Sequence, residues 1–351
     1  MSKRIVIALL GVVLIVATSA SPGVSQKLPE RLVWGTMKAP SASYQLSLGV
    51  TDFINQNTNI NVTVRPYPTP SAAIRGLHVK EADLSIMAYV HANHFARGID
   101  SEVEKASDVA APEIRILMGS DVVWVAWVTR ANSGIKTMAD LKGKTVNYAL
   151  PGLILKNFLG GESLRAVDID PQKDIKAVLF DRPGGEIQAL IDKKLDAIFV
   201  TIDQPALIEA ETTVGVKILS YPMNAFQKLP PVLKDVSVIA KDVPIGYRRI
   251  VKEPLTIMGF GDTIGCRNDL NEDGAYLIVK LLMTRGHELK KIAPMFMEIG
   301  EKEFALPGNF SRLVPIHPGA IKYFKEIGFW TPAHEKMQKE AVEELSKIAP
   351  R

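Results

Sequence analysis

The residues best able to do chemistry include a short acidic stretch late in the chain. Asp269, Asn271 and Asp273 have the spacing that opens a calcium-binding loop. The twelfth position counted from Asp269 is Lys280, where the calcium ion requires a bidentate glutamate. Because a lysine cannot coordinate a cation, this stretch favours the N-terminal cap of a helix over a metal site.

Histidine and cysteine side chains are further candidates for chemistry. His91 and His94 lie three residues apart, but two imidazoles make half a metal site and no third ligand is evident. Cys266, the only cysteine, and His317 are the only pair that could act as nucleophile and base. Neither a G-x-x-x-x-G-K-[ST] nor a G-x-S-x-G motif occurs. We therefore expect no metal, no cofactor and no catalysis, with an enzyme on the same fold as the lesser alternative.

The composition is that of an ordinary globular protein. Hydrophobic residues make up 47% and charged residues 23% of the 351 residues, and this length suggests two domains. The formal net charge is +4 and no long basic run occurs, which argues against binding to nucleic acid. A single cysteine cannot form an intramolecular disulfide.

The N-terminus has the pattern of an export signal. Lys3 and Arg4 precede an apolar run over residues 5–16, and residues 18–20 are small, as a signal peptidase requires. The apolar run is shorter than the about 20 residues that a membrane-spanning helix needs. We expect residues 1–26 to be a signal peptide and the mature protein to be periplasmic, with an uncleaved anchor as the alternative.

Hydrophobic periodicity predicts alternating strands and helices, followed by a mostly helical tail. A helical tail cannot build a sheet of its own, so we expect it to pack back onto the first unit. The predicted strands are 32–34, 60–64, 84–87, 114–118, 122–128, 145–148, 175–180, 195–200 and 255–260, and the predicted helices are 44–55, 71–77, 91–97, 138–141, 153–164, 186–192, 274–284, 288–296, 318–327 and 335–348.

This alternation predicts an α/β protein with a largely parallel sheet and two lobes. We expect two crossing segments between the lobes, near residues 119–131 and 240–255. Lobe 1 would comprise residues 27–121 plus 250–351, and lobe 2 residues 122–249. A cleft between two such lobes, at the carboxyl ends of strands, is where ligands bind in open α/β sheets.

Four stretches of the sequence then resemble a known family. They are W-G-T at 34–36 with Tyr44 and Leu46 after it, K-E-A-D-L at 80–84, A-N-S-G-I-K at 131–136 with M-A-D-L-K-G-K at 138–144, and P-I-H-P-G-A at 315–320. In this order they resemble the TAXI class of TRAP transporter solute receptors. The resemblance implies the two-lobed periplasmic-binding-protein type 2 fold with two hinge-crossing segments. It also implies a receptor that delivers a small molecule to a TRAP-type integral membrane permease.

The chain departs from the family pattern where the cleft is expected. Residues 35–41 read G-T-M-K-A-P-S, where the family usually has G-T-G-x-x-G. Ala88 stands where the family often has glutamine. Leu153, Ile154 and Leu155 stand where the family has small or polar residues at the start of a helix. These aliphatic side chains favour a partly apolar ligand over the family's usual amino acids and dicarboxylates.

We expect the ligand to contact both lobes of a monomeric receptor. Lys38 and Arg182 would bind an acidic group of the ligand, and Tyr44 and Leu153 would suit an apolar or aromatic portion. An ABC-type importer or a signalling system is the alternative partner, and the neighbouring genes would decide between them. The expected contacts are Thr36, Lys38, Ser41, Tyr44, Thr69, Ser71 and Tyr89 from lobe 1 and Pro151, Gly152, Leu153, Arg182, Asp203 and Gln204 from lobe 2.

Overall fold

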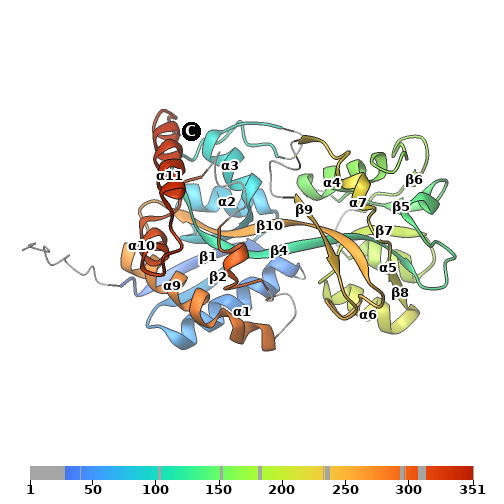
Figure 1. Ribbon diagram of the computed structural model, residues 1–351, viewed down its shortest axis with the longest axis horizontal. Helices are drawn as coiled ribbons and strands as arrows, with labels where there is room; N and C mark the ends of the chain where they lie inside the picture. Colours follow the sequence, from blue (N-terminus) through green and yellow to red (C-terminus); the bar gives the residue numbers. More distant parts are fainter. Residues whose placement is uncertain are drawn as a thin grey trace, which may run out of the picture.

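One long curled sheet runs through the molecule (Figure 1). The computed structural model describes residues 28–350 except 40, 102–103, 151–152, 181–183, 232, 234–237, 293–295, 297 and 307–313. Over these residues the strand order is β2-β1-β3-β10-β4-β7-β5-β6, with β8 paired to β4 and β9 to β10. The strands are β1 (Arg31–Met37), β2 (Asn61–Tyr67), β3 (Leu84–Ala88), β4 (Ile114–Arg130), β5 (Thr145–Asn147), β6 (Lys176–Ala177), β7 (Ala197–Thr201), β8 (Val216–Ile218), β9 (Val238–Val243) and β10 (Leu255–Arg267).

Helices cover the sheet and build most of the C-terminal part. The α-helices are α1 (Ala42–Asn57), α2 (Pro70–His78), α3 (Tyr89–Arg97), α4 (Ile154–Arg165), α5 (Gly185–Ile191), α6 (Pro205–Val214), α7 (Met223–Phe226), α9 (Glu272–Arg285), α10 (Pro318–Glu326) and α11 (Pro332–Leu345), and the short 3-10 helices are η1 (Met138–Leu141), η2 (Gly286–Lys291) and η4 (Lys302–Phe304). Of the helices in the described part of the chain, none combines the length and the apolar character needed to cross a membrane.

Capping residues fix the starts of several of these helices. The side chain of Asn271 accepts the backbone N–H of Gly274 at 2.8 Å, which confirms the predicted helix cap in the acidic stretch. Thr137 begins η1 in a capping box with Asp140. Thr69 caps α2, which begins at Pro70, one residue before the predicted start at 71, because proline suits the first helical position.

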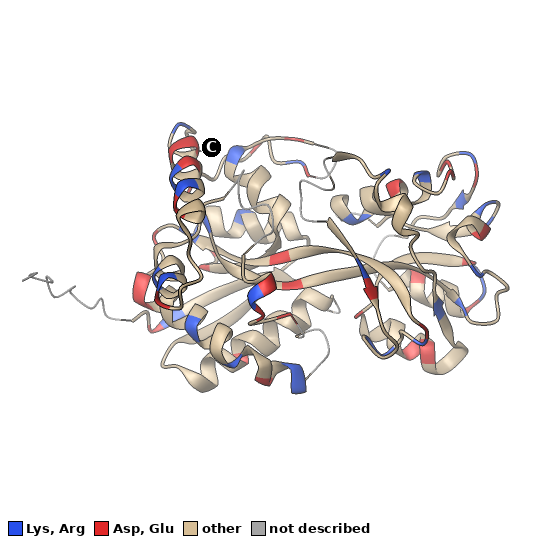
Figure 2. Cartoon of the chain, in the orientation of Figure 1, with Lys and Arg blue, Asp and Glu red and all other residues tan. Residues whose placement is uncertain are grey.

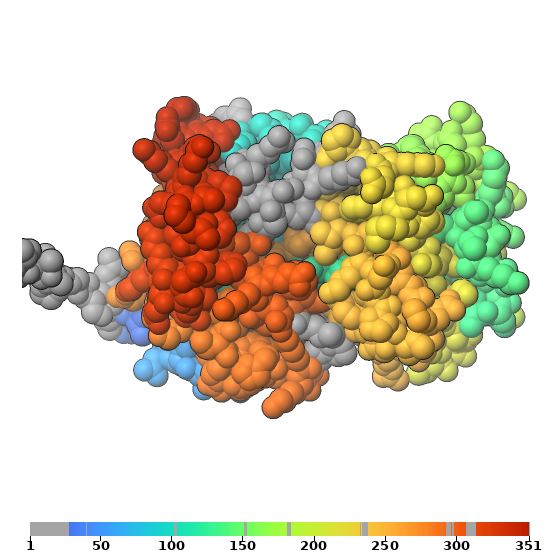
Figure 3. Space-filling view, in the orientation of Figure 1, coloured from blue at the N-terminus to red at the C-terminus, as the bar shows by residue number. Residues whose placement is uncertain are grey.

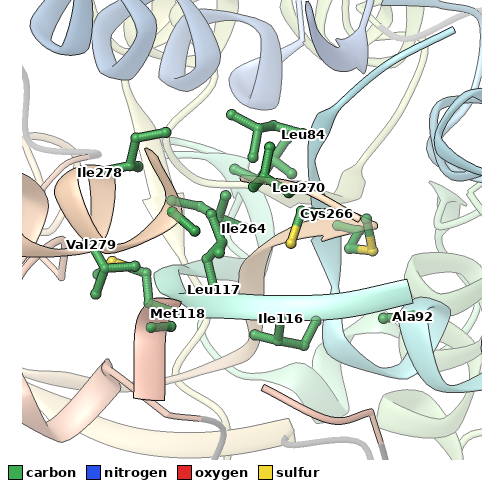
Figure 4. Close-up of a cluster of buried hydrophobic side chains, with 14 of the residues drawn as sticks. Leu84, Ala92, Ile116, Leu117, Met118, Ile264, Cys266, Leu270, Ile278 and Val279 are labelled. Carbon is green, nitrogen blue, oxygen red and sulfur yellow. The ribbon is translucent and has the colours of Figure 1, made fainter. Parts of the chain in front are cut away.

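The buried apolar side chains form separate cores that define two lobes. The first lobe contains one core, built from β1 to β3, the start of β4, the end of β10 and the C-terminal helices. Figure 4 shows part of this core, including Cys266 among aliphatic neighbours. The second lobe contains two cores, on opposite faces of its part of the sheet. Along β4, Val125 and Trp127 enter one of these cores while Trp124 and Ala126 enter the other, as strand alternation requires.

The C-terminal tail returns to the first lobe, as the sequence predicted. Buried residues of α9, α10 and α11 belong to the first core, and the red and orange segments cover this lobe in Figure 3. In place of the first part of the predicted helix 288–296 the chain forms the short 3-10 helix η2, and residues 293–295 of that prediction lie outside the described residues. The predicted strand 175–180 is confined to β6. The sequence analysis did not find α6, α7, β8 or β9.

Both connections between the lobes are the long strands β4 and β10 (Figure 1). Met118 belongs to the first core and Val122 to a second-lobe core, and Phe260 and Ile264 divide in the same way along β10. The predicted break in β4 is therefore absent. The predicted second crossing at 240–255 is wrong, because the chain crosses within β10, where the register with β4 shifts after Asp262.

The residue boundaries proposed for the two lobes remain a prediction. The cores place Ile250, Val251 and Leu255 with the second lobe, although the predicted first lobe begins again at residue 250. The division at residue 121 coincides with the change of core along β4.

Replacement of Gly119 by alanine is expected to destabilise the crossing strand β4. A Cβ atom at this position would lie 1.8 Å from the carbonyl oxygen of Phe304, a clash with backbone that costs about 1–3 kcal/mol or more. Urea unfolding of G119A would measure the loss. The control is G261A on the paired strand, where an added Cβ meets nothing within 4 Å. Equal midpoints for the two variants would show that the segment at Phe304 is not seated on β4.

Candidate ligand-binding cleft

A cavity of about 140 Å³ lies where the two lobes meet. Its walls come from the β1–α1 turn, α2 and β3 of the first lobe, the crossing parts of β4 and β10, and the starts of α4 and α6 in the second lobe. Most of the lining side chains are apolar, among them Met37, Leu46, Ile86, Val122, Leu150, Leu153 and Phe260. Such a cavity would bind the apolar part of a ligand by burying it.

Two aspartates face each other on the crossing strands at this cavity. Asp121 of β4 is the register partner of Asp262 of β10, and both line the cavity. Figure 2 shows acidic positions in the middle of these two long strands. The hydroxyl of Ser120 donates a hydrogen bond to Asp121 at 2.7 Å.

Burial decides the ionisation of this pair. It raises the pKa of Asp121 to about 7, and the nearby carboxylates add to the rise. Burial and the charge of Asp121 raise the pKa of Asp262 well above its usual value. Two like charges at adjacent buried positions cannot both ionise cheaply, so the pair holds at least one proton at neutral pH.

A third aspartate of the cavity is held by a buried arginine. Arg248 is 1% exposed, and its guanidinium lies 3.0 Å from Asp203 and 3.0 Å from Glu298. Tyr247 and Trp124 also donate hydrogen bonds to Glu298, at 3.0 Å and 3.2 Å. Asp203 is thus held in place by a network that includes Glu298. Glu298 lies in the chain between Phe296 and Ile299, which belong to the first-lobe core.

Lys156 brings the opposite charge to the cavity from the first turn of α4. Its side chain is 6% exposed and lines the cavity. Its Nζ has no hydrogen-bond partner among the described residues. Burial lowers the pKa of Lys156 to about 8, a shift that Glu186 partly opposes. The amine is therefore mostly charged at neutral pH and has no counter-ion in contact among the described residues, which is costly for a buried ammonium.

His91 adds a neutral polar group to the first-lobe wall. It is 8% exposed and lines the cavity, and its Nδ1 has no partner among the described residues. Burial, with a smaller contribution from His94, lowers the pKa of His91 to about 4. Its Nε2 lies 3.6 Å from Glu104, too far for a hydrogen bond. The neutral imidazole can donate to or accept from a ligand.

The predicted contacts divide into those that line this cavity and those that do not. Ser41, Leu153, Asp203 and Gln204 line it. Pro151, Gly152 and Arg182 lie outside the described residues. None of the remaining six is among the lining residues, namely Thr36, Lys38, Tyr44, Thr69, Ser71 and Tyr89.

Several of these remaining polar groups have partners within the protein. The hydroxyl of Thr36 donates to the carbonyl oxygen of Ser43 at 3.1 Å. Thr69 accepts the N–H of Ala72 at 3.1 Å as the cap of α2. Ser71 donates to Glu104.

The other three differ mainly in exposure. Tyr89 is buried in the first core, where burial raises its pKa. Lys38 is exposed and Tyr44 is half-buried.

Sequence reasoning missed the ionisable groups that distinguish the cavity. Lys156, Asp121 and Asp262 were not considered, and His91 was considered only as a metal ligand. Each of the first three is a single charge within an otherwise apolar stretch. A lone charge in a buried strand or helix start is the signal that could have found them, because such a charge is rare in a core without a function.

A comparison with protein families adds an independent result. Residues 35–328 match the model of the NMT1-like family, over most of the chain. The chain belongs to the NMT1-like family. This match covers both lobes and every residue that lines the cavity.

Solved structures with the same fold are periplasmic binding proteins. PhnD1 from Prochlorococcus marinus, solved in complex with methylphosphonate, has a TM-score of 0.50 at 11% identity, covering 86% of this chain and 97% of that chain. The aliphatic sulphonate-binding protein SsuA from Escherichia coli has a TM-score of 0.46 at 14% identity, covering 91% and 87%. A sulfonate-binding protein named as part of an ABC transporter from Methylobacillus flagellatus has a TM-score of 0.47 at 14% identity, covering 92% and 98%.

These comparisons establish the receptor fold of this NMT1-like chain. It has the two-lobed fold of periplasmic solute-binding proteins. None of the three is named as a TRAP receptor, and one is named as part of an ABC transporter. The TAXI class and the TRAP-type permease therefore stay predictions, and so does the signal peptide, which lies outside the described residues.

Proposed function

We propose that this protein is an extracytoplasmic receptor that captures a small organic anion with an apolar body and delivers it to a membrane transporter. The observation that carries the proposal is the buried ammonium of Lys156, which has no hydrogen-bond partner among the described residues and lines a mostly apolar cavity between two lobes. An anionic group of a ligand would supply the missing partner.

Lys156 takes the role that the sequence analysis gave to Lys38 and Arg182. A charge-assisted hydrogen bond contributes about 1.5–3 kcal/mol, and a buried apolar side chain of a ligand contributes a similar amount. Leu150, Leu153 and Phe260 line the same cavity and would contact that apolar part. The ligand is thus expected to be a carboxylate or a comparable organic anion.

Lobe closure would follow from contact with both lobes. A ligand between Lys156 of the second lobe and His91 of the first stabilises the closed state more than the open one. A shift from 1:99 to 99:1 needs about 5.5 kcal/mol of differential affinity. One charge-assisted hydrogen bond, one neutral hydrogen bond and a buried apolar group can supply this amount. The strands β4 and β10 would carry the hinge.

The transporter partner has two candidates. The motifs at 131–144 and 315–320 resemble TAXI receptors and favour a TRAP-type permease, whereas the name of the sulfonate-binding relative favours an ABC-type importer. That relative is only 14% identical, so its partner is not carried over to this chain by likeness alone. A fused TRAP permease gene beside this one would support the first partner, and an ATPase gene the second.

Native mass spectrometry of the purified protein is the direct test of the receptor function. We expect a co-purifying small molecule that is released on unfolding and carries an anionic group. Rebinding of that molecule should reduce the radius of gyration in small-angle scattering, because the lobes close. An unchanged radius at saturation would contradict closure, and a bound molecule without an acidic group would contradict the role of Lys156.

A further inference from the structure

The cleft holds two oppositely charged regions in different parts of its wall. Lys156 lies on α4 of the second lobe, whereas Asp121 and Asp262 face each other on β4 and β10, where the chain passes between the lobes. All three side chains line the same cavity. A ligand that fills this cavity therefore meets a cation at one place and a pair of carboxyl groups at another.

Lys156 and the two aspartates do not form ion pairs with each other. Lys156 forms no ion pair within 4.0 Å and no hydrogen bond with a described residue. The acid whose charge acts on its amine is Glu186, which does not line the cavity. The charges of Glu298, Asp203 and Arg248 act on Asp121, and the charge of Asp121 acts on Asp262. Lys156 forms no ion pair with either aspartate, and the two charged regions lie on different elements of the cavity wall.

The surface around these regions is apolar and carries one further unpartnered polar group. Val122, Leu150, Leu153 and Phe260 line the cavity together with the charged groups. His91 is more than nine-tenths buried at the same cavity, and its Nδ1 has no partner among the described residues. Buried polar atoms normally have partners, so the unpartnered atoms of His91 and Lys156 both indicate a polar ligand in the cavity.

We propose that the ligand is a zwitterion whose ammonium and carboxylate are separated by an apolar spacer. The carboxylate binds the ammonium of Lys156, and the ligand ammonium binds the carboxyl pair Asp121–Asp262. This inference rests on the receptor function proposed above and specifies its ligand class. An α-amino acid fits less well, since its two charged groups share one carbon atom, whereas the apolar side chains that line the cavity suit a spacer between the charged groups.

The charge balance of the cleft supports this class over a plain carboxylate. Asp203 is already paired with Arg248 at 3.0 Å. Asp121 and Asp262 are therefore the acidic side chains of the cavity that have no cation in contact among the described residues. An ammonium placed there lets the pair release its shared proton and form charge-assisted hydrogen bonds. A fatty-acid-like ligand would leave the carboxyl pair without such a partner.

The test compares matched ligands on the full chain after unfolding and refolding to remove any co-purified molecule. Calorimetric titration would use 4-aminobutanoate, 6-aminohexanoate and 8-aminooctanoate, with hexanoate, hexylamine and leucine as controls. At least one of the three ω-amino acids is expected to bind about 10-fold or more tightly than each control, the factor that one charge-assisted hydrogen bond provides.

Two variants locate the ammonium. D262N and D121N are each expected to weaken the best ω-amino acid by about 10-fold while changing hexanoate by less than about 2-fold. The matched control is D168N, because Asp168 is 86% exposed and is not among the residues that line the cavity, and an unchanged affinity is expected there. Two separate acid variants keep the test valid if one of them fails to fold.

The outcomes separate this inference from the receptor function. Equal binding of hexanoate and the ω-amino acids, or tighter binding of leucine, would overturn the separated zwitterion and leave the receptor standing. A second outcome is that no compound in the panel binds and that the co-purified ligand has no basic nitrogen. This outcome would overturn the zwitterionic ligand and leave the receptor function standing. No binding in the panel together with no co-purified molecule would overturn both.

Discussion

Replacement of Lys156 by methionine is expected to stabilise the ligand-free protein and to abolish its affinity for anionic ligands. The shift of the lysine pKa from 10.5 to about 8 corresponds to about 3 kcal/mol against the charged form in the folded state. Methionine has a similar length and no charge, so this cost disappears. Part of the gain is lost because Glu186, whose pKa burial raises, no longer has the lysine charge nearby. A net gain of about 1–2 kcal/mol is expected.

The pH dependence of this gain has a definite sign. Below about pH 8 the amine is protonated in both the folded and the unfolded chain, so the cost in the wild type is constant. Between about pH 8 and 10.5 only the unfolded chain keeps the proton. The wild type therefore gains stability as the pH rises through this window. The advantage of K156M should be largest at pH 7 and should shrink towards pH 10.5.

Urea unfolding of both proteins at pH 7 and pH 9.5 would measure these differences. The control is K336M on α11, where the lysine side chain is 79% exposed, and no change in midpoint is expected. Anion affinity, measured by titration with the co-purified ligand, should fall by about 100-fold or more in K156M, because the only cation lining the described cavity is lost. A less stable K156M with unchanged affinity would contradict the role given to this lysine.

The alternation of strands and helices was readable from the sequence because it is a local property. Periodicity located α1, β3 and the C-terminal helices, since each buries one face against a neighbour. The position of the second crossing was not readable in this way. The sequence predicted a strand over 255–260, whereas β10 continues to Arg267. In the structure an added Cβ at Gly259 would lie 2.6 Å from Val122, so close packing of β10 on β4 requires this glycine.

The cleft was predicted in outline, and its charges were not. Ser41 and Thr69 were both predicted to contact the ligand, but serine and threonine also cap helices. Ser41 accepts the N–H of Tyr44 at 3.2 Å and also lines the cavity, whereas Thr69 only caps α2. Sequence cannot separate these two roles. Nor can it show that Asp121 and Asp262, which are 141 positions apart in the numbering, are register partners, because their pairing depends on the complete sheet.

Replacement of Arg248 by methionine is expected to destabilise the protein. This is the opposite of the stabilisation expected from K156M, although both residues are buried cations. Arg248 has Asp203 and Glu298 within 3.0 Å, and these carboxylates offset the burial that would otherwise lower its pKa, so that its pKa is raised. Its removal leaves two buried carboxyl groups without a cation. Loss of one partner from such a network costs about 3–5 kcal/mol.

Urea unfolding of R248M, with R249M as the control, would measure this loss. Arg249 is the next residue and is exposed, so its replacement should change the stability by less than about 0.5 kcal/mol. The double variant R248M/E298Q should recover part of the loss, since one of the uncompensated charges is removed with the arginine.

Arg248 lies near the second-lobe core residue Ile250 in the chain, and Glu298 lies beside the first-lobe core residue Ile299. An R248M variant as stable as the wild type would mean that the Arg248–Glu298 ion pair does not hold the lobes together. The expected loss of stability would instead support a structural role for this ion pair at the hinge. A buried cation with partners thus stabilises the fold, and the buried cation at Lys156, which has no hydrogen-bond partner among the described residues, is left for the ligand.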